Sequence, residues 1–419
     1  MFACPPVPPT PPPAVDRPHY LLDVRAHSGF SEVSGDVTVR FTPNRPTHRL
    51  VFRLWPNGPM QRREGSHLDV GKATADGQTL PSDEPDPTTR VLHVDLDAGQ
   101  EITVTVPWRL DVPWAGRDRI GRFTDGVRLG SFFPVLAWDS RRGWVTDPPA
   151  RILGESSTTP TADFDVHVEA PTGYTVLSSG SATGPGTWHA RAVRDVGIAV
   201  GRFQTETAVA HAPGRVLVRV AVAGAAQPVA TVLKHAVRSL QGLARAYGPY
   251  RWPTYTVVVT PDLFREGIEY PTLVFLGRGP FIRVITQHET AHQWFYSLVG
   301  NDQARDPWLD EALATWSQLQ LDGGVAQALQ TAPFALPRHV GAPVNYFAAA
   351  PQRYFAEVYG GGVRALASLG PPRRVDCALK LYTARNAFRI ARPGDLLDVL
   401  NGIFPHAERR LRRFGIHRA

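Results

Sequence analysis

The segment ITQHETAHQWF, residues 285–295, contains two histidines four positions apart and a glutamate directly after the first. Residues 283–299 contain neither Gly nor Pro, so we expect one helix that ends at Gly300. On that helix His288 and His292 lie one turn apart on a single face, where both imidazoles can bind one metal ion. Glu289 is rotated by about 100° from His288 and can reach a water bound to that ion. These residue types indicate a zinc centre with a carboxylate base; the alternative is a buried helix whose two histidines are purely structural.

A second helix is predicted to begin in DPWLDEALATW, residues 306–316. Asp306 can cap this helix, and Pro307 suits its first position. Glu311 follows His292 by nineteen residues, and an antiparallel helical hairpin would bring its carboxylate back to the same ion. Three protein ligands with an open fourth position are typical of a catalytic zinc site rather than a structural one.

The motif HETAHQW, followed by the glutamate of PWLDEALA, resembles the gluzincin aminopeptidase family, the aminopeptidase N-type zinc metallopeptidases. The resemblance implies that His288, His292 and Glu311 hold one zinc ion and that Glu289 is the catalytic base. It also implies a thermolysin-like fold for the part of the chain that carries these motifs. The long helical C-terminal domain of the large family members has no counterpart here, so the chain is similar to a short two-domain bacterial form with a more open cleft.

A third motif, EGIEYP at residues 266–271, resembles the substrate-binding GxMEN element of the same family. The match makes Glu269 the residue that binds the free α-ammonium group of a peptide, through a charge-assisted contact. Gly267 belongs to the same substrate-binding element. The segment departs from the family pattern at Glu266, where a small residue is usual, and at Ile268, where methionine is usual. Glu266 is therefore expected to alter the pocket.

Family members also carry a tyrosine, in a Y-x-K-G element, whose hydroxyl stabilises the oxyanion. The segment EVYGGGVRAL makes Tyr359 the best match, although Gly361 stands where lysine is expected. Tyr354 and Tyr346 are the alternatives for this catalytic role. Each of the three tyrosines also suits a half-buried position in the core.

The periodicity of the chain predicts two domains of different type. Between residues 16 and 205, short alternating or apolar runs separated by turn residues predict an antiparallel, sandwich-like β domain. From 206 to 419 the pattern changes, with a helix over 229–247, a buried strand at 255–260 and mostly helical text thereafter. The expected fold class is therefore α+β multidomain, with a thermolysin-like α/β-to-helical peptidase domain at 206–419.

The first fifteen residues are rich in proline and predict a disordered tether that does not pack. Cys4 and Cys377 are the two cysteines of the chain, and a bridge between a flexible terminus and a distant helix is not expected. A cysteine before a Pro-rich tether resembles a processed bacterial lipoprotein, which makes Cys4 a possible lipid anchor. We expect a secreted or cell-envelope location in a bacterium, with the cytoplasm as the alternative.

The overall composition limits the other partners. Hydrophobic residues make up 43% of the 419 positions, which suits packed domains and excludes a disordered chain. No apolar run approaches about 18 residues, so we expect no transmembrane helix. The net charge of +7 comes from scattered arginines without an aromatic-plus-basic motif, so we expect no nucleic-acid partner. The sequence does not predict an oligomeric state.

These observations predict a zinc aminopeptidase that removes N-terminal residues from peptides with a free N-terminus. One alternative is a thermolysin-type endopeptidase, which would share the zinc and the base but lack the ammonium anchor. The other is a non-catalytic adhesion or scaffold module on the same fold.

Overall fold

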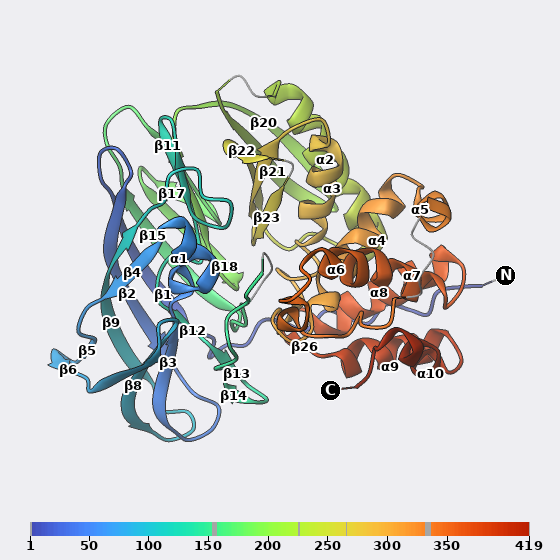
Figure 1. Cartoon of the computed structure of the whole chain (residues 1–419), viewed down its shortest axis with the longest axis horizontal. Helices are drawn as coiled ribbons and strands as arrows, with labels where there is room; N and C mark the ends of the chain where they lie inside the picture. The colour runs from blue at the N-terminus through green and yellow to red at the C-terminus, as the bar shows by residue number, and fades with distance from the viewer. Residues whose placement is uncertain (1, 153–156, 225–226, 265, 332–336, 419) are drawn as a thin grey trace.

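The computed structural model has a lobe built from strands and a second lobe built from a smaller sheet and helices (Figure 1). It describes residues 2–152, 157–224, 227–264, 266–331 and 337–418. The largest cluster of buried apolar side chains runs through both lobes, from Tyr20 to Ile416. The two lobes therefore share one continuous core.

The first lobe is formed by the strands that the alternating pattern predicts. In β1, β2 and β15 every second residue is buried, because successive side chains of a strand point to opposite faces. The largest sheet, counted over the described residues, has nine strands: β17 (Ser181–Gly184), β18 (Thr187–Val193), β15 (Ala162–Glu169), β1 (His19–Ala26), β2 (Glu32–Phe41), β9 (Ile102–Asp111), β5 (Thr74–Ala75) and β6 (Gln78–Thr79) in this order, with β4 (His67–Val70) also paired to β9.

Smaller sheets complete this lobe. One consists of β10 (Gly121–Phe123), β11 (Gly126–Gly130), β19 (Gly197–Gly201) and β16 (Thr175–Ser178), another of β12 (Val135–Leu136), β3 (Thr47–Arg53), β8 (Thr89–Leu96) and β7 (Ser82–Asp86), and a hairpin of β13 (Trp138–Asp139) and β14 (Gly143–Trp144). A short helix, α1 (Pro59–Glu64), follows β3.

The pairing in the large sheet departs from the expected purely antiparallel arrangement. Strand β1 pairs antiparallel with β2 but parallel with β15, with Tyr20 opposite Phe164. A parallel neighbour needs a long crossover instead of a hairpin, and the many residues between β2 and β15 provide it. The sequence pattern within a strand reveals its buried face but not the direction of its neighbours.

The second lobe begins with a five-stranded sheet in the order β20 (Phe203–Ala212), β21 (Gly214–Ala223), β22 (Thr254–Phe264), β24 (Leu273–Arg278) and β23 (Gly267–Tyr270). The helix predicted over 229–247 is present as α2 (Val229–Tyr247) and ends before Gly248. Strand β23 pairs antiparallel with β24, with Glu269 opposite Val274. Because β23 is last in this order, one of its edges carries no neighbouring strand among the described residues.

Helices make up most of the remaining chain. They are α3 (Ile282–Ala291), α4 (Glu311–Leu321), α5 (Val325–Thr331), α6 (Gln352–Tyr354), a π-helix at Phe355–Gly360, α7 (Gly361–Ala367), α8 (Pro372–Asn386), α9 (Pro393–Ile403) and α10 (Ala407–Leu411), with a small pair of strands, β25 (Gly300–Asn301) and β26 (Ile390–Ala391). Among the helices that the structure describes, none combines the length and apolar composition needed to cross a lipid bilayer.

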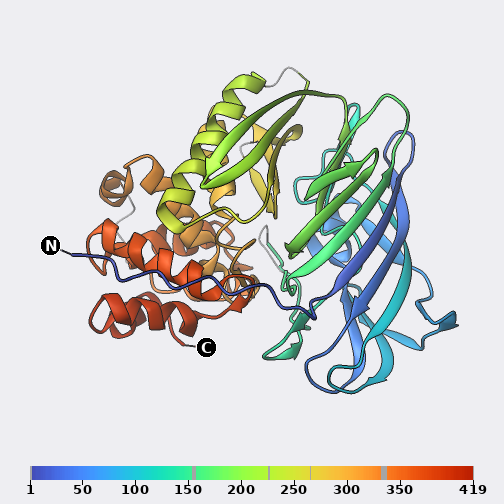
Figure 2. The same ribbon diagram turned by 180° about the vertical axis from the view of Figure 1, so that it is seen from behind.

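The prediction that residues 1–15 do not pack is wrong for the described part of this segment, because Phe2, Cys4 and Thr10 contact the second lobe. In Figure 2 the segment runs as an extended strap over the C-terminal helices before entering β1. Phe2 contacts the core, and the guanidinium of Arg374 lies 4.8 Å from its ring centre. Further along the strap, Arg251 donates a hydrogen bond to the hydroxyl of Thr10. Proline-rich backbone needs no internal hydrogen bonds, so it can lie extended along a surface made by other elements.

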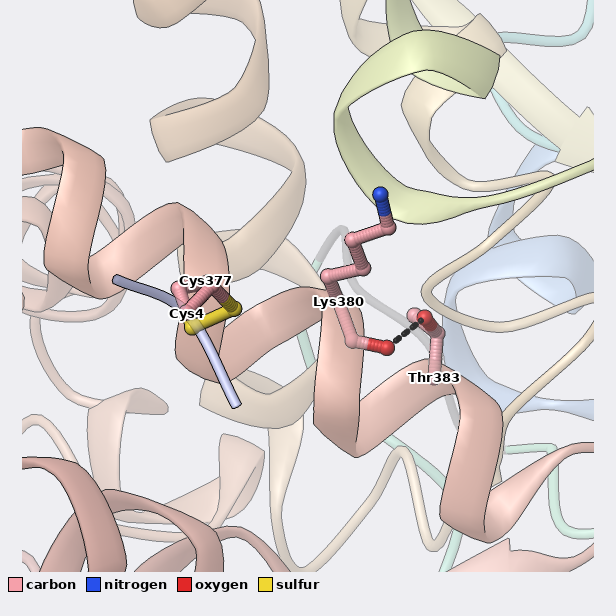
Figure 3. The surroundings of a disulfide bond; sticks show 4 residues. All are labelled: Cys4, Cys377, Lys380 and Thr383. Carbon is pink, nitrogen blue, oxygen red and sulfur yellow. Dashed lines mark hydrogen bonds between the residues drawn. A yellow bond between two sulfur atoms is a disulfide. The ribbon is translucent and has the colours of Figure 1, made fainter. Parts of the chain in front are cut away.

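The expectation of two unpaired cysteines is also wrong. Cys4 and Cys377 form a disulfide that joins the strap to α8, with Cα atoms 5.7 Å apart (Figure 3). A separation of 373 residues carries no information about contact, because the path of the strap decides it. The sulfur of Cys4 is bonded to Cys377 and is therefore not available for a lipid, so the structure does not support the predicted anchor.

We expect Cys377→Ser to destabilise the protein by about 2–5 kcal/mol, because the bridge restricts the unfolded chain. The measurement is unfolding by heat or guanidinium under non-reducing conditions. Reductant should shift the wild type towards the variant and leave the variant unchanged. Equal stability of the two proteins, or free thiols in the unreduced wild type, would contradict the disulfide.

Candidate metal centre

Helix α3 is fixed on both sides of its histidine-bearing face. The hydroxyls of Thr290 and Tyr255, the latter on β22, are 2.9 Å apart in the core. The side chain of Gln293 donates to the carbonyl of Tyr270 at 2.9 Å and accepts from the amide of Thr272 at 2.8 Å. These bonds tie the end of β23 to the end of α3, so the strand that carries Glu269 cannot shift relative to the histidines.

The predicted extent of this helix is wrong at its C-terminal end. Helix α3 ends at Ala291 rather than before Gly300, and the chain turns at once, with the amide of Ser297 bonded to the carbonyl of His292. The turn buries Trp294, whose indole donates to the carbonyl of Gly248 at 3.1 Å, and Phe295, whose ring lies 5.2 Å from that of Tyr247. Burial of two large aromatic rings outweighs the helical preference of the segment.

The structure brings together the three side chains that the sequence predicts as metal ligands. The Nε2 atoms of His288 and His292 are 3.2 Å apart, and Glu311 Oε2 lies 3.2 Å from the first and 3.5 Å from the second. A tetrahedral zinc ion with bonds of about 2.0–2.1 Å separates its ligand atoms by about 3.3–3.4 Å. The donor set and its spacing therefore fit one zinc ion.

Glu311 enters the site differently from the prediction. Residues Pro307–Leu309 form a 3₁₀ turn, and Glu311 is the first residue of α4, while Asp306 makes no capping hydrogen bond. Burial opposes ionisation of Glu311, but the charges and hydrogen bonds of His292 and His288 hold its pKa below its ordinary value. The carboxylate is therefore ionised and ready to bind a cation.

Asp310 is a functional residue that the sequence analysis missed. Its Oδ1 lies 2.6 Å from Nδ1 of His292, which also contacts the carbonyl of Phe295 at 3.1 Å. A carboxylate on the far nitrogen fixes the tautomer and orientation of a metal-binding imidazole. Burial alone would lower the pKa of His292, but Asp310, Glu269 and Glu311 raise it well above its ordinary value. The sequence offered one signal for Asp310, because an acidic residue stands directly before the predicted ligand Glu311.

Glu289 lies in the same buried cluster. Its side chain is 4% exposed, and its Oε2 has no hydrogen-bond partner among the described residues. Burial and the nearby carboxylates of Glu269 and Glu311 raise its pKa well above the ordinary value, although His292 opposes this shift. A divalent cation between these side chains would stabilise the ionised form. The excess of buried negative charge is a second reason why the site suits a metal.

Glu269 is buried beyond the histidines, at 3% exposure. Its Oε1 accepts a hydrogen bond of 3.1 Å from Gln303, which also donates to Oδ2 of Asp310 at 2.7 Å. The guanidinium of Arg119 approaches Glu269 to 4.0 Å. Glu269 is thus held in place and linked to His292 through Gln303 and Asp310. Nothing in the sequence pattern indicated Gln303 or Arg119.

These side chains border a pocket of about 290 Å³. Its described lining consists of Glu266, Gly267, Glu269, Val284, Ile285, His288, Glu289, His292, Glu311, Thr315, Gln318, Phe355 and Tyr359. A larger cavity of about 450 Å³ lies elsewhere, between the strap, the first lobe and residues 386–395, and contains none of the proposed ligands. The candidate ligands and the candidate base therefore line the smaller pocket.

Gly267 lies against the candidate base. A Cβ atom at this position would overlap Cγ and Oε1 of Glu289. Glycine is therefore required here because the Glu289 side chain packs directly on the backbone of β23, and the role of this residue includes positioning the carboxylate.

The three candidate tyrosines have different surroundings. Tyr359 lines the pocket and stacks on His288, with ring centres 5.8 Å apart. Tyr354 is fully buried behind it, and its hydroxyl has no hydrogen-bond partner among the described residues. Tyr346 is 49% exposed and stacks on His339 away from the pocket. Burial and the charge of Glu311 raise the pKa of Tyr359 well above its ordinary value, so its hydroxyl remains protonated and can donate.

Comparison with known proteins agrees with this geometry. No protein-family model matches the chain. Human aminopeptidase RNPEPL1 is 28% identical over 204 residues, which covers 40% of this chain and 27% of the relative. Rat aminopeptidase B is 30% identical over 83 residues, covering 18% of this chain and 13% of the relative. The matches thus span about a quarter of the first relative and less of the second.

Solved structures match over nearly the whole chain. The M1 zinc metallopeptidase from Deinococcus radiodurans has a TM-score of 0.70 at 20% identity, covering 96% of this chain and 94% of that one. A mutant of an M1 zinc metallopeptidase from the same organism, solved with a Tyr-Ser-Ala substrate, has a TM-score of 0.68 over the same shares. The chain has the mixed sheet-and-helix fold of M1 zinc metallopeptidases. The resemblance to the aminopeptidase N-type gluzincins is confirmed.

We expect Gly267→Ala to lower the hydrolytic rate by about 10²-fold, because displacement of a catalytic group by about 1 Å has that effect. Metal content should remain that of the wild type. Gly214→Ala is the matched control, since a Cβ there meets nothing within 4 Å. Full activity of Gly267→Ala would show that Glu289 does not depend on this contact.

Proposed function

We propose that the chain is a zinc-dependent aminopeptidase that hydrolyses the N-terminal peptide bond of peptides. The main observation in support is that Glu311 Oε2 lies 3.2 Å from Nε2 of His288 and 3.5 Å from Nε2 of His292, with Glu289 buried beside them. The aminopeptidase relatives and a structural relative with a bound tripeptide support this function.

One zinc ion would be held by His288, His292 and Glu311. When bound, zinc lowers the pKa of a coordinated water and polarises the scissile carbonyl. Asp310 supports the site by holding Nδ1 of His292, so that Nε2 faces the ligand position.

Glu289 is assigned the proton transfers. Its unpartnered Oε2 can take a proton from the attacking water and deliver it to the leaving amine. Gly267 lets the carboxylate approach the backbone of β23, and burial among other acidic groups makes the carboxylate a better base than an exposed glutamate. Tyr359, which stays protonated, would donate a hydrogen bond to the developing oxyanion, and Tyr354 would support it from behind.

Glu269 is assigned to the free α-ammonium group of the substrate. Arg119, at 4.0 Å, and Gln303 compensate this buried carboxylate in part, and an ammonium group in the pocket would add a charge-assisted contact. Strand β23, which carries Glu269, has an edge without a neighbouring strand, and an extended peptide can add to such an edge antiparallel. The peptide would then run from Glu269 past Gly267, with its first peptide bond near the three metal ligands.

The two alternatives fit the site less well. An endopeptidase does not bind a free N-terminus. It would therefore not need the buried carboxylate of Glu269, which Gln303 holds where it can pair with an ammonium group. A scaffold module has no need for a complete set of ligands with an orienting Asp310.

We further infer that the chain functions in an oxidising compartment outside the bacterial cytoplasm, supported by the Cys4–Cys377 disulfide. We also propose a boundary near residue 205 between the β domain and the catalytic domain. The start of the five-stranded sheet at Phe203 supports this position.

We expect Glu289→Gln to retain zinc and to lose about 10²–10⁴-fold in turnover, because it removes proton transfer but no ligand. Metal content is measured by mass spectrometry, and activity with a panel of aminoacyl-coumarin amides. The N-acetylated amides should not be hydrolysed by the wild type. Equal cleavage of free and acetylated substrates would favour the endopeptidase, and an inactive zinc-loaded wild type would favour the scaffold.

A further inference from the structure

Glu266 is a carboxylate of the pocket that the proposed mechanism does not use. It lies one residue before β23 and three residues before Glu269, and its side chain lines the same pocket. The described lining includes four glutamates and two histidines but no lysine or arginine. Zinc would balance Glu311 and Glu289, and the substrate ammonium would balance Glu269. Glu266 is then the one lining carboxylate whose charge has no assigned partner.

Among the described residues, Glu266 has cationic neighbours but no ion-pair partner. Its charged neighbours are two arginines, Arg128 and Arg117, and two acids, Asp118 and Glu64, so their effects oppose one another. Arg128 is already engaged, since its Nε donates to Asp262 at 2.9 Å and its other nitrogens donate to the carbonyls of Asp118 and Gly116. No ion pair to Glu266 is present among the described residues. A cation in the pocket would therefore be attracted to this side chain.

The position of Glu266 relative to Glu269 determines which part of a substrate it can contact. A peptide that adds antiparallel to the edge of β23, with its ammonium at Glu269, advances by about 3.4 Å per residue. Glu266 precedes Glu269 by three residues, which is about 10 Å of extended chain, so the third or fourth residue of the peptide lies opposite Glu266. Glu266 is thus placed beyond the cleaved bond, not at the first side chain.

The lining of the pocket also includes aliphatic side chains. Val284 and Ile285, from the part of α3 that precedes His288, line the same pocket as Glu266. A lining that combines aliphatic side chains with a carboxylate suits a side chain with an aliphatic stem and a positive end.

We propose that Glu266 is a specificity-determining residue that selects peptides with lysine or arginine at the third or fourth position. The stem of that residue packs on Val284 and Ile285, and its cation pairs with Glu266. This inference rests on the proposed aminopeptidase function for the direction of the peptide. It identifies a substrate class by its charge downstream of the scissile bond.

The test compares kcat/KM for Ala-Ala-Lys-Ala with Ala-Ala-norleucine-Ala, and for Ala-Ala-Ala-Lys with Ala-Ala-Ala-norleucine, since norleucine keeps the stem and removes the charge. We expect the wild type to favour the lysine peptide of at least one pair by about fivefold, the value of a partly exposed ion pair near 1 kcal/mol. The ratio should fall to about one in Glu266→Gln and at high salt. Glu206→Gln, an exposed glutamate on β20, is the control and should keep the wild-type ratio.

Failure of this inference is distinguishable from failure of the proposed function. Calorimetry measures the affinity of both peptides of each pair for zinc-loaded Glu289→Gln protein. The same measurement is made on protein that carries both Glu289→Gln and Glu266→Gln. Hydrolysis with equal ratios in wild type and Glu266→Gln would overturn the role of Glu266 and leave the aminopeptidase intact. Absence of hydrolysis together with a Glu266-dependent preference in binding would overturn the aminopeptidase and support Glu266. Equal affinities and equal rates for the two peptides of each pair would overturn the inference.

Discussion

The close approach of Glu311 to the two histidines is the contact on which the proposed site depends. It joins the end of α3 to the beginning of α4, and it brings three electron-pair donors to separations of 3.2–3.5 Å. Asp310 holds the imidazole of His292, and Gln293 ties the strand that carries Glu269 to the same helix end. The early termination of α3 at Ala291 follows from the same packing, since the turn after it buries Trp294 and Phe295 against α2.

A second constraint is the concentration of buried negative charge. Glu269, Glu289, Asp310 and Glu311 are all less than 5% exposed, and buried carboxylates are costly unless cations or donors compensate them. His292 and Gln303 compensate part of this charge. A zinc ion and a substrate ammonium group would compensate the remainder, each at a different carboxylate. The need to compensate buried negative charge thus relates metal binding, proton transfer and recognition of a free N-terminus. The same need at Glu266 accounts for the proposed preference for cationic peptides.

The sequence predicted the parts of the site that depend on local spacing. His288, Glu289 and His292 follow from helical geometry, and the predicted helical hairpin supplied Glu311. Resemblance to a known family supplied Glu269 and Tyr359. Asp310 and Gln303 were missed because their roles arise from contacts between elements, although Asp310 stands directly beside a predicted ligand. The alternating pattern predicted strands between residues 16 and 205 but not the parallel pairing of β1. The strap and its disulfide were mispredicted because composition describes how residues 1–15 behave alone, whereas α8 and Arg374 provide a surface for them.

A crystal of the zinc-loaded protein, measured on both sides of the zinc absorption edge, tests the metal centre most directly. The predicted result is one anomalous peak at about 2.0–2.2 Å from Nε2 of His288, Nε2 of His292 and a carboxylate oxygen of Glu311. Glu269, Glu289 and His292 form a second group whose ligand atoms lie within 4.8 Å of one another. A peak in that group instead, or no peak in protein saturated with zinc, would contradict the assignment.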